Sequence, residues 1–141
     1  MPSPSPDADP REAAEARRPL ILIVDDNEKN RKLAREVLRA AGFVTLQAAS
    51  AAEAIALAGE HLPDVILMDL RLPDMGGTDA AQRLGAQART ASIPVVAVSS
   101  LPLDGGTDWL QQAGFAGWLE KPIDVDEFPD QVRSYCAYSG R

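Results

Sequence analysis

The sequence predicts an α/β fold built on a parallel β-sheet, and three observations support this class. From Leu20 onward, short apolar runs alternate with helical patterns five times, which is typical of βαβ units. The run at residues 65–68 has no polar position, as expected for a central strand covered on both faces. Finally, polar residues follow most of the predicted strands, at the edge where parallel sheets hold their ligands.

The first strand and helix are predicted at residues 20–24 and 27–41. The strand is a continuous apolar run, and the helix carries one apolar stripe, made of Leu33, Ala34, Val37, Leu38 and Ala41. Gly42 follows the last residue of that stripe and is expected to end the helix as its C′ residue.

The next strand is predicted at residues 43–47 and the next helix at residues 50–60. Ser50 and Glu53 have the spacing of a capping box, which marks the start of this helix. The third strand occupies residues 65–70, and the prolines and glycines that follow it predict a loop.

A helix of weaker pattern is predicted at residues 78–88, with Ala80, Ala81 and Leu84 on its inner face. The fourth strand follows at residues 95–98, and a short helix is expected at residues 107–113.

The fifth strand is predicted at residues 115–119, and the final helix is expected to begin near Asp124. Asp124 and Glu127 have capping-box spacing, and Ile123 is placed to contact Phe128. Pro129 lacks a backbone N–H, so this helix is predicted to kink there.

Residues 1–19 differ in composition from the rest, with Pro2, Pro4, Pro6 and Pro10 among small and charged side chains. Such a segment cannot bury enough apolar surface to fold, so it is predicted to be a disordered tail. The domain proper is expected to span residues 20–141. A single domain is the default for a chain of 141 residues.

Composition restricts the function further. Fourteen Lys and Arg against twenty-one Asp and Glu give a formal charge of −7, which argues against binding to nucleic acid or to an anionic membrane. No apolar run is long enough to span a bilayer. Cys136 is the only cysteine, so an intrachain disulfide is excluded, and a reducing, cytoplasmic location is expected.

Polar residues close four of the five predicted strands: Asp25 with Asp26, then Asp69, Ser99 and Lys121. Right-handed crossovers place these strand ends at one edge of the sheet, so the side chains should converge. Carboxylates packed close together repel each other unless a cation is present, and their oxygens suit Mg²⁺. A carboxylate beside Mg²⁺ and a lysine is the arrangement that an aspartate needs to accept a phosphoryl group.

Four motifs resemble those of the receiver domains of two-component response regulators. They are Val24-Asp25-Asp26-Asn27, the ten residues from Met68 to Gly77, the seven from Pro94 to Ser100, and Glu120-Lys121-Pro122-Ile123. The resemblance extends from Leu20 to about Tyr138. It implies a flavodoxin-like fold with a five-stranded parallel sheet, in the order 2-1-3-4-5, surrounded by five helices.

The same resemblance implies the role of each site residue. Asp69 takes the phosphoryl group from a histidine kinase or a histidine phosphotransfer protein. Asp25, Asp26, Asp69 and the backbone carbonyl of Arg71 hold Mg²⁺.

Two further residues complete the implied chemistry. Ser99 supplies the switch hydroxyl, and Lys121 contacts the phosphoryl group, with the Lys121–Pro122 bond cis. Trp118 occupies the switch position where the family usually has Tyr or Phe. The resemblance therefore does not decide whether the larger indole turns inward on phosphorylation or only packs at the strand.

The output implied by the resemblance is a set of protein contacts. The downstream protein target is expected on the face formed by the fourth helix, the fifth strand and the fifth helix of the family fold. The chain is thus expected to act as a stand-alone receiver in a two-component system or phosphorelay. It is not expected to be an enzyme beyond Mg²⁺-dependent phosphorylation and dephosphorylation of itself.

Three alternative functions concern the same residues. A phosphatase of the haloacid dehalogenase type needs a second acid two residues after the nucleophile, where Arg71 stands. A nucleotide-binding fold needs a glycine-rich loop after the first strand, but residues 25–28 are anionic and lack glycine. The remaining alternative is a pseudo-receiver, which uses the same fold as a docking module and is not phosphorylated.

Overall fold

A computed structural model describes residues 18–100 and 108–136 of the chain. The predicted disordered tail falls almost entirely outside these residues. Within them, five parallel strands form one sheet in the order β2-β1-β3-β4-β5, as predicted. The strands are β1 (Leu20–Val24), β2 (Val44–Ala48), β3 (Val65–Asp69), β4 (Val95–Ser99) and β5 (Gly117–Glu120).

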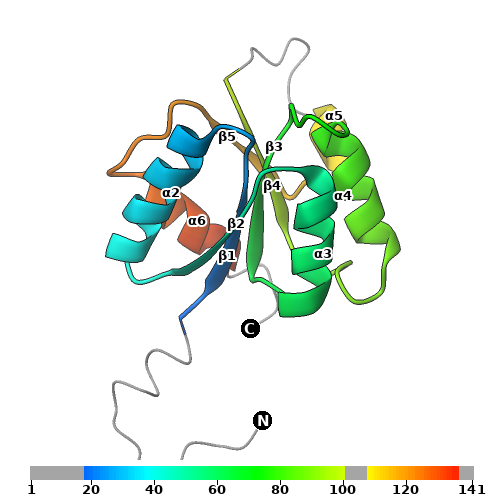
Figure 1. Ribbon diagram of the computed structural model, residues 1–141, viewed down its shortest axis with the longest axis horizontal. Coiled ribbons are helices and arrows are strands. Elements are labelled where there is room, and N and C mark those ends of the chain that lie inside the picture. The colour runs from blue at the N-terminus through cyan, green and yellow to red at the C-terminus, as the bar shows by residue number, and fades with distance from the viewer. Residues whose placement is uncertain (1–17, 101–107, 137–141) are drawn as a thin grey trace, which may run out of the picture.

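Helices cover both faces of this sheet (Figure 1). They are α2 (Glu28–Ala40), α3 (Ala51–His61), α4 (Gly77–Ala86), α5 (Asp108–Gln112) and α6 (Phe128–Cys136). Helices α2 and α6 pack on one face, and α3, α4 and α5 pack on the other.

The strands explain why two helical layers are needed. In β1, Ile21 and Ile23 point to the layer of α2 and α6, whereas Leu22 and Val24 point to the layer of α3, α4 and α5. All five residues of β3 are buried, because this strand lies in the centre of the sheet. Its uniformly apolar run is therefore the expected sequence of a strand without a solvent face.

Local signals set several of the helix ends. Asn27 caps α2 by accepting a hydrogen bond from the amide of Asn30, and Gly42 has a φ of +98°, as a C′ residue requires. Ser50 Oγ accepts from the amide of Glu53, so the predicted cap of α3 is confirmed. The Glu53 carboxylate, however, accepts from Ala49 rather than from the capping residue itself.

The structure differs from the prediction in the last third of the chain. Phe115 does not begin a strand, because its amide closes the end of α5 by donating to the carbonyl of Leu110, so β5 starts at Gly117. Asp124 caps a separate turn, and α6 begins at Phe128. Pro129 therefore lies in the first turn of α6, where its missing N–H costs little, and the predicted mid-helix kink becomes a helix start.

One residue of the predicted stripe on α2 also departs from its expected place. Ala34 and Leu38 are buried against the sheet, but Leu33 is 42% exposed at the edge of that contact.

Candidate functional site

The carboxyl ends of β1 and β3 bring three carboxylates together. Val24 lies beside Met68 in the parallel register, so the residues that follow them, Asp25 and Asp69, leave the sheet side by side. Ligand oxygens of Asp25, Asp26 and Asp69 all lie within 4.8 Å of one another. Asp25 and Asp69 are buried, whereas Asp26 is exposed, so the cluster has a buried floor and one acid open to solvent.

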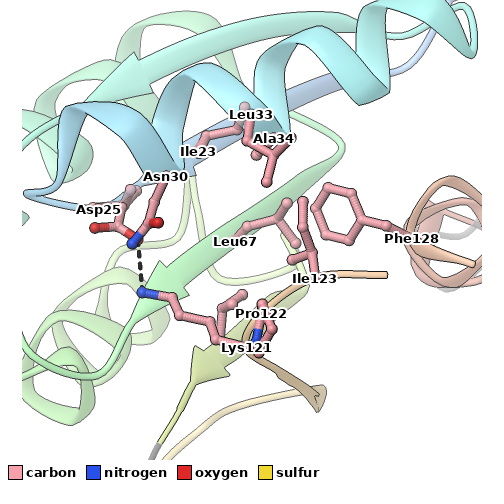
Figure 2. Close-up of a pocket in the computed structure, with 12 residues that line it drawn as sticks. Ile23, Asp25, Asn30, Leu33, Ala34, Leu67, Lys121, Pro122, Ile123 and Phe128 are labelled. Carbon is pink, nitrogen blue, oxygen red and sulfur yellow. Dashed lines mark hydrogen bonds and ion pairs between the residues drawn. The ribbon is translucent and has the colours of Figure 1, made fainter. Parts of the chain in front are cut away.

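Lys121 reaches this cluster from the end of β5, the outer strand beside β4. Its Nζ donates to Asp25 Oδ2 at 2.7 Å and to Asp69 Oδ2 at 3.1 Å. Figure 2 shows the lysine side chain extending toward Asp25, with the first of these contacts dashed. The backbone holds Lys121 in place, because its amide donates to the carbonyl of Ser99. The Lys121–Pro122 peptide bond is cis, as expected.

Burial and charge oppose each other at this site. Burial raises the pKa of Asp69 above its usual value, although the amide of Arg71 and the charge of Lys121 act in the opposite direction. Burial also works to lower the pKa of Lys121, but the hydrogen bonds and charges of Asp25 and Asp69 outweigh it and raise that pKa. The ammonium is therefore firmly charged, while ionised Asp69 is held at a cost in free energy.

The second carboxylate oxygen of Asp25 and that of Asp69 are each held by a backbone amide. Asp25 Oδ1 accepts from the amide of Asn27 at 2.8 Å, and Asp69 Oδ1 accepts from the amide of Arg71 at 2.9 Å. In addition, Arg31 Nη1 donates to the backbone carbonyl of Asp25 at 2.7 Å. The orientations of the two buried acids are thus fixed before any ligand arrives.

Two other predicted site residues lie on the strands β4 and β5. Ser99 ends β4 next to β3 and is only 3% exposed. Trp118 lies on β5 beside Ala97, and its indole is half-buried against the layer of α3, α4 and α5. The Trp118 indole Nε1 is buried and meets no acceptor among the described residues.

A groove adjoins the site between α2 and the segment after β5. Asp25 and Lys121 stand at one end, and Leu67, Ile123 and Phe128 supply apolar walls (Figure 2). Leu33, the exposed residue of α2, also borders the groove.

Two residues at the site were not identified from the sequence. A Cβ on Gly77 would lie 2.7 Å from the carbonyl oxygen of Asp69, so this position holds glycine for lack of space. Asp74 accepts hydrogen bonds from the amides of Ala51 and Ala52, which belong to another element. The glycine pair after β3 signals a tight loop, but no sequence pattern pairs Asp74 with residues more than twenty positions away.

Comparison with known proteins supports the same family. The family model described as the response regulator receiver domain matches residues 21–133. The polar-differentiation response regulator DivK of Brucella ovis is 38% identical over 115 residues, which cover 82% of this chain and 94% of DivK.

Solved structures of similar proteins share the fold. A putative response regulator from Chloroflexus aurantiacus J-10-fl has a TM-score of 0.80 at 27% identity, covering 86% of this chain and 99% of its own. The receiver domain of the sensor histidine kinase PA1611 from Pseudomonas aeruginosa has a TM-score of 0.77 at 29% identity, covering 85% and 98% of the two chains. That structure has a magnesium ion coordinated in its active-site cleft.

In the described part of the present chain, no helix is long and apolar enough to cross a membrane.

Proposed function

Because the chain belongs to the response regulator receiver family, we propose that it accepts a phosphoryl group on Asp69 from a phosphohistidine of a kinase or phosphotransfer protein. The observation that carries this proposal is the convergence of Asp25, Asp26 and Asp69 with Lys121 at one edge of the sheet. The parallel sheet brings these four positions together, and a module that only docks needs neither the three acids nor the lysine at them.

The donor set fits a magnesium ion. Three carboxylates offer hard oxygen ligands within 4.8 Å of one another, and Asp26 leaves the cluster open to solvent, as an ion that retains waters requires. Arg71 is placed two residues after Asp69, with its amide bonded to Asp69 Oδ1, and its carbonyl is the fourth proposed ligand. When bound, Mg²⁺ would offset the carboxylate charge and coordinate an oxygen of the incoming phosphoryl group.

The chain's own residues divide the chemistry among them. An oxygen of the Asp69 carboxylate attacks phosphorus while the bond from phosphorus to the donor imidazole breaks. The electron pair of that bond remains on the imidazole, which takes a proton from solvent, and Asp69 becomes an acyl phosphate. Lys121, already 3.1 Å from Asp69, stabilises the added negative charge, and the Ser99 hydroxyl donates to a phosphoryl oxygen.

The signal is proposed to leave through protein contacts. The downstream target would bind the face of α5, β5 and α6, which corresponds to the fourth helix, fifth strand and fifth helix of the family fold. Ser99 and Trp118, on the neighbouring strands β4 and β5, connect the phosphoryl site to this face. We also propose a cytoplasmic location, as expected from the single cysteine.

Phosphorylation of the intact protein tests the proposal. Wild type, treated with acetyl phosphate and Mg²⁺, is expected to gain one phosphoryl group by mass spectrometry, and Asp69→Ala is expected to gain none. Asp79→Ala removes an exposed acid of α4 that is not part of the cluster, and is the matched control that should behave as wild type. No mass gain in wild type, or an equal gain in Asp69→Ala, would overturn the proposal and favour the pseudo-receiver alternative.

A further inference from the structure

Asp74 connects the loop after β3, which follows the proposed metal ligands Asp69 and Arg71, to the start of α3. It lies on the loop between β3 and α4, five residues after Asp69, and is exposed. Its Oδ1 accepts from the amide of Ala51 at 2.9 Å, and its Oδ2 accepts from the amide of Ala52 at 2.9 Å. Both carboxylate oxygens are thus used by consecutive amides at the start of α3.

These amides are unpaired by their own helix, because the first turn of a helix has no internal acceptors. The two bonds hold the pKa of Asp74 below its usual range, so the carboxylate stays ionised at neutral pH. A negative charge at this end of α3 also has a favourable interaction with the helix dipole.

The loop that carries Asp74 is closed at its base. The amide of Gly77 donates to the carbonyl of Leu70 at 3.1 Å, and Arg71 and Gly76 form an antiparallel bridge. Asp74 lies between these closed ends, so its bonds to α3 fasten the tip of the loop. The path of the backbone at Arg71 is consequently restrained from both sides.

The start of α3 is in turn tied to the other acids. Ser50 and Glu53 fix the turn before α3, with the Glu53 carboxylate holding the amide of Ala49. One residue earlier, the carbonyl of Ala48 accepts from the amide of Asp25 at 3.1 Å. A continuous series of contacts therefore runs from the loop of Asp69 through α3 to Asp25.

We propose that Asp74 is a positioning residue, which sets the distance between the loop holding Asp69 and Arg71 and the turn holding Asp25 and Asp26. This inference rests on the proposed Mg²⁺ site and extends it to a residue that does not touch the ion. Loss of the Asp74 carboxylate removes none of the proposed Mg²⁺ ligands, but it allows the loop after β3 and the turn after β1 to move apart. The expected result is weaker Mg²⁺ binding without loss of the fold.

Isothermal titration with Mg²⁺ alone measures this effect. Asp74→Ala is expected to raise the dissociation constant for Mg²⁺ by about tenfold, in line with other residues that orient metal ligands indirectly. Asp74→Asn keeps one acceptor oxygen and the same size, and should give an intermediate value. Hydrogen exchange of the metal-free protein should show faster exchange at the amides of Ala51, Ala52 and Gly77 in Asp74→Ala.

Thr90→Val is the stability control, because the buried Thr90 hydroxyl donates to the carbonyl of Leu84, at the opposite end of α4 from the loop of Asp69. Loss of this hydrogen bond should lower the melting temperature, yet leave Mg²⁺ affinity within about twofold of wild type, since none of the contacts between Asp74 and Asp25 is changed. Equal Mg²⁺ affinity in Asp74→Ala and wild type would overturn the inference. An equal loss in Thr90→Val would do so as well, because it would show that fold stability alone matters.

The outcomes separate this inference from the proposed function. If wild type binds Mg²⁺ but acetyl phosphate does not phosphorylate it, the proposed function fails, while a lower Mg²⁺ affinity of Asp74→Ala still supports the positioning role of Asp74. If wild type is phosphorylated and Asp74→Ala binds Mg²⁺ with wild-type affinity, only the positioning role of Asp74 is refuted. Failure of wild type to bind Mg²⁺ at millimolar concentration would count against both.

Discussion

The contact between Gly77 and the backbone of Asp69 gives a prediction whose size follows from the structure. In Gly77→Ala, the new Cβ would stand 2.7 Å from Asp69 O and 2.9 Å from Leu70 Cα, whereas an ordinary contact is 3.4–4 Å. Both opposing atoms belong to the backbone, so no side chain can turn away to make room. Relief requires the end of β3, which carries Asp69, to move away from the start of α4.

Overpacking of this kind costs about 1–3 kcal/mol of unfolding free energy. Replacing glycine by alanine returns up to about 1 kcal/mol in a helix interior and about half of that at Gly77, the first residue of α4, so the net loss should be about 0.5–2.5 kcal/mol. For a domain of this size, such a loss lowers the melting temperature by about 2–12 °C. Because the displaced backbone carries the phosphoacceptor, phosphorylation by acetyl phosphate should also slow.

Gly85→Ala is the control for Gly77→Ala. Gly85 lies in the same helix, and a Cβ there would meet nothing within 4 Å. This variant should be stabilised by about 0.5–1 kcal/mol and phosphorylated at the wild-type rate. Thermal unfolding followed by circular dichroism and a phosphorylation time course measure both quantities. If Gly77→Ala matches wild type in stability and rate, the close contact does not constrain the site and the argument is refuted.

Three more predictions follow from the charges and the indole at the site. Lys121→Met should slow phosphorylation by on the order of 10²-fold, measured with acetyl phosphate. Burial works to lower the pKa of Lys121, but its carboxylate partners raise that pKa above 10.5 in the folded protein. The stabilising effect of the charged Lys121 should therefore persist up to pH 10.5 and be lost only as the pH rises through the pKa of the folded state. If the difference in melting temperature between wild type and Lys121→Met is already gone at pH 9, this reasoning is contradicted. Burial raises the pKa of Asp69 above 3.8, so its ionised form destabilises the fold, and Asp69→Asn should melt higher than wild type at pH 7, with the gap closing below pH 3.8. Lower melting of Asp69→Asn at pH 7 would reverse the sign of the argument. If Trp118 moves as a switch, beryllofluoride with Mg²⁺ should change its fluorescence in a Trp109→Phe background, beyond the change with Mg²⁺ alone; identical spectra would indicate a static indole.

The sheet could be predicted from the sequence because burial on both faces leaves a simple trace. Residues 65–68 are apolar without interruption, and the acids and lysine directly follow strand ends, so a parallel sheet forces them to converge. Their contact in the structure, with Lys121 bonded to both Asp25 and Asp69, is the geometric consequence of that topology. The assignment of roles to these residues remains a prediction that phosphorylation experiments test.

Contacts that depend on how a loop approaches a helix could not be predicted in the same way. Asp74 binds amides 22 and 23 positions away, and its partner is set by the packing of α3 against α4 rather than by local pattern. Likewise, Phe115 reads as a strand residue by its apolar character, yet its amide closes the end of α5. In both cases, hydrogen bonds outside the regular pattern of strands and helices decide the outcome, and intrinsic preferences contain no information about them.

The charge balance of the site links its stability to its chemistry. Three ionised carboxylates and one ammonium leave a formal excess of two negative charges in a largely buried cluster. Lys121 alone cannot compensate them, and burial raises the pKa of Asp69, with the charge of Asp25 adding a smaller effect in the same direction. A divalent cation supplies the missing charge, which is why the same burial that destabilises Asp69 makes the cluster a strong candidate for Mg²⁺. Addition of a phosphoryl group then brings new negative charge to a place already organised around positive partners, so acceptance of the phosphoryl group depends on Lys121 and on the ion together.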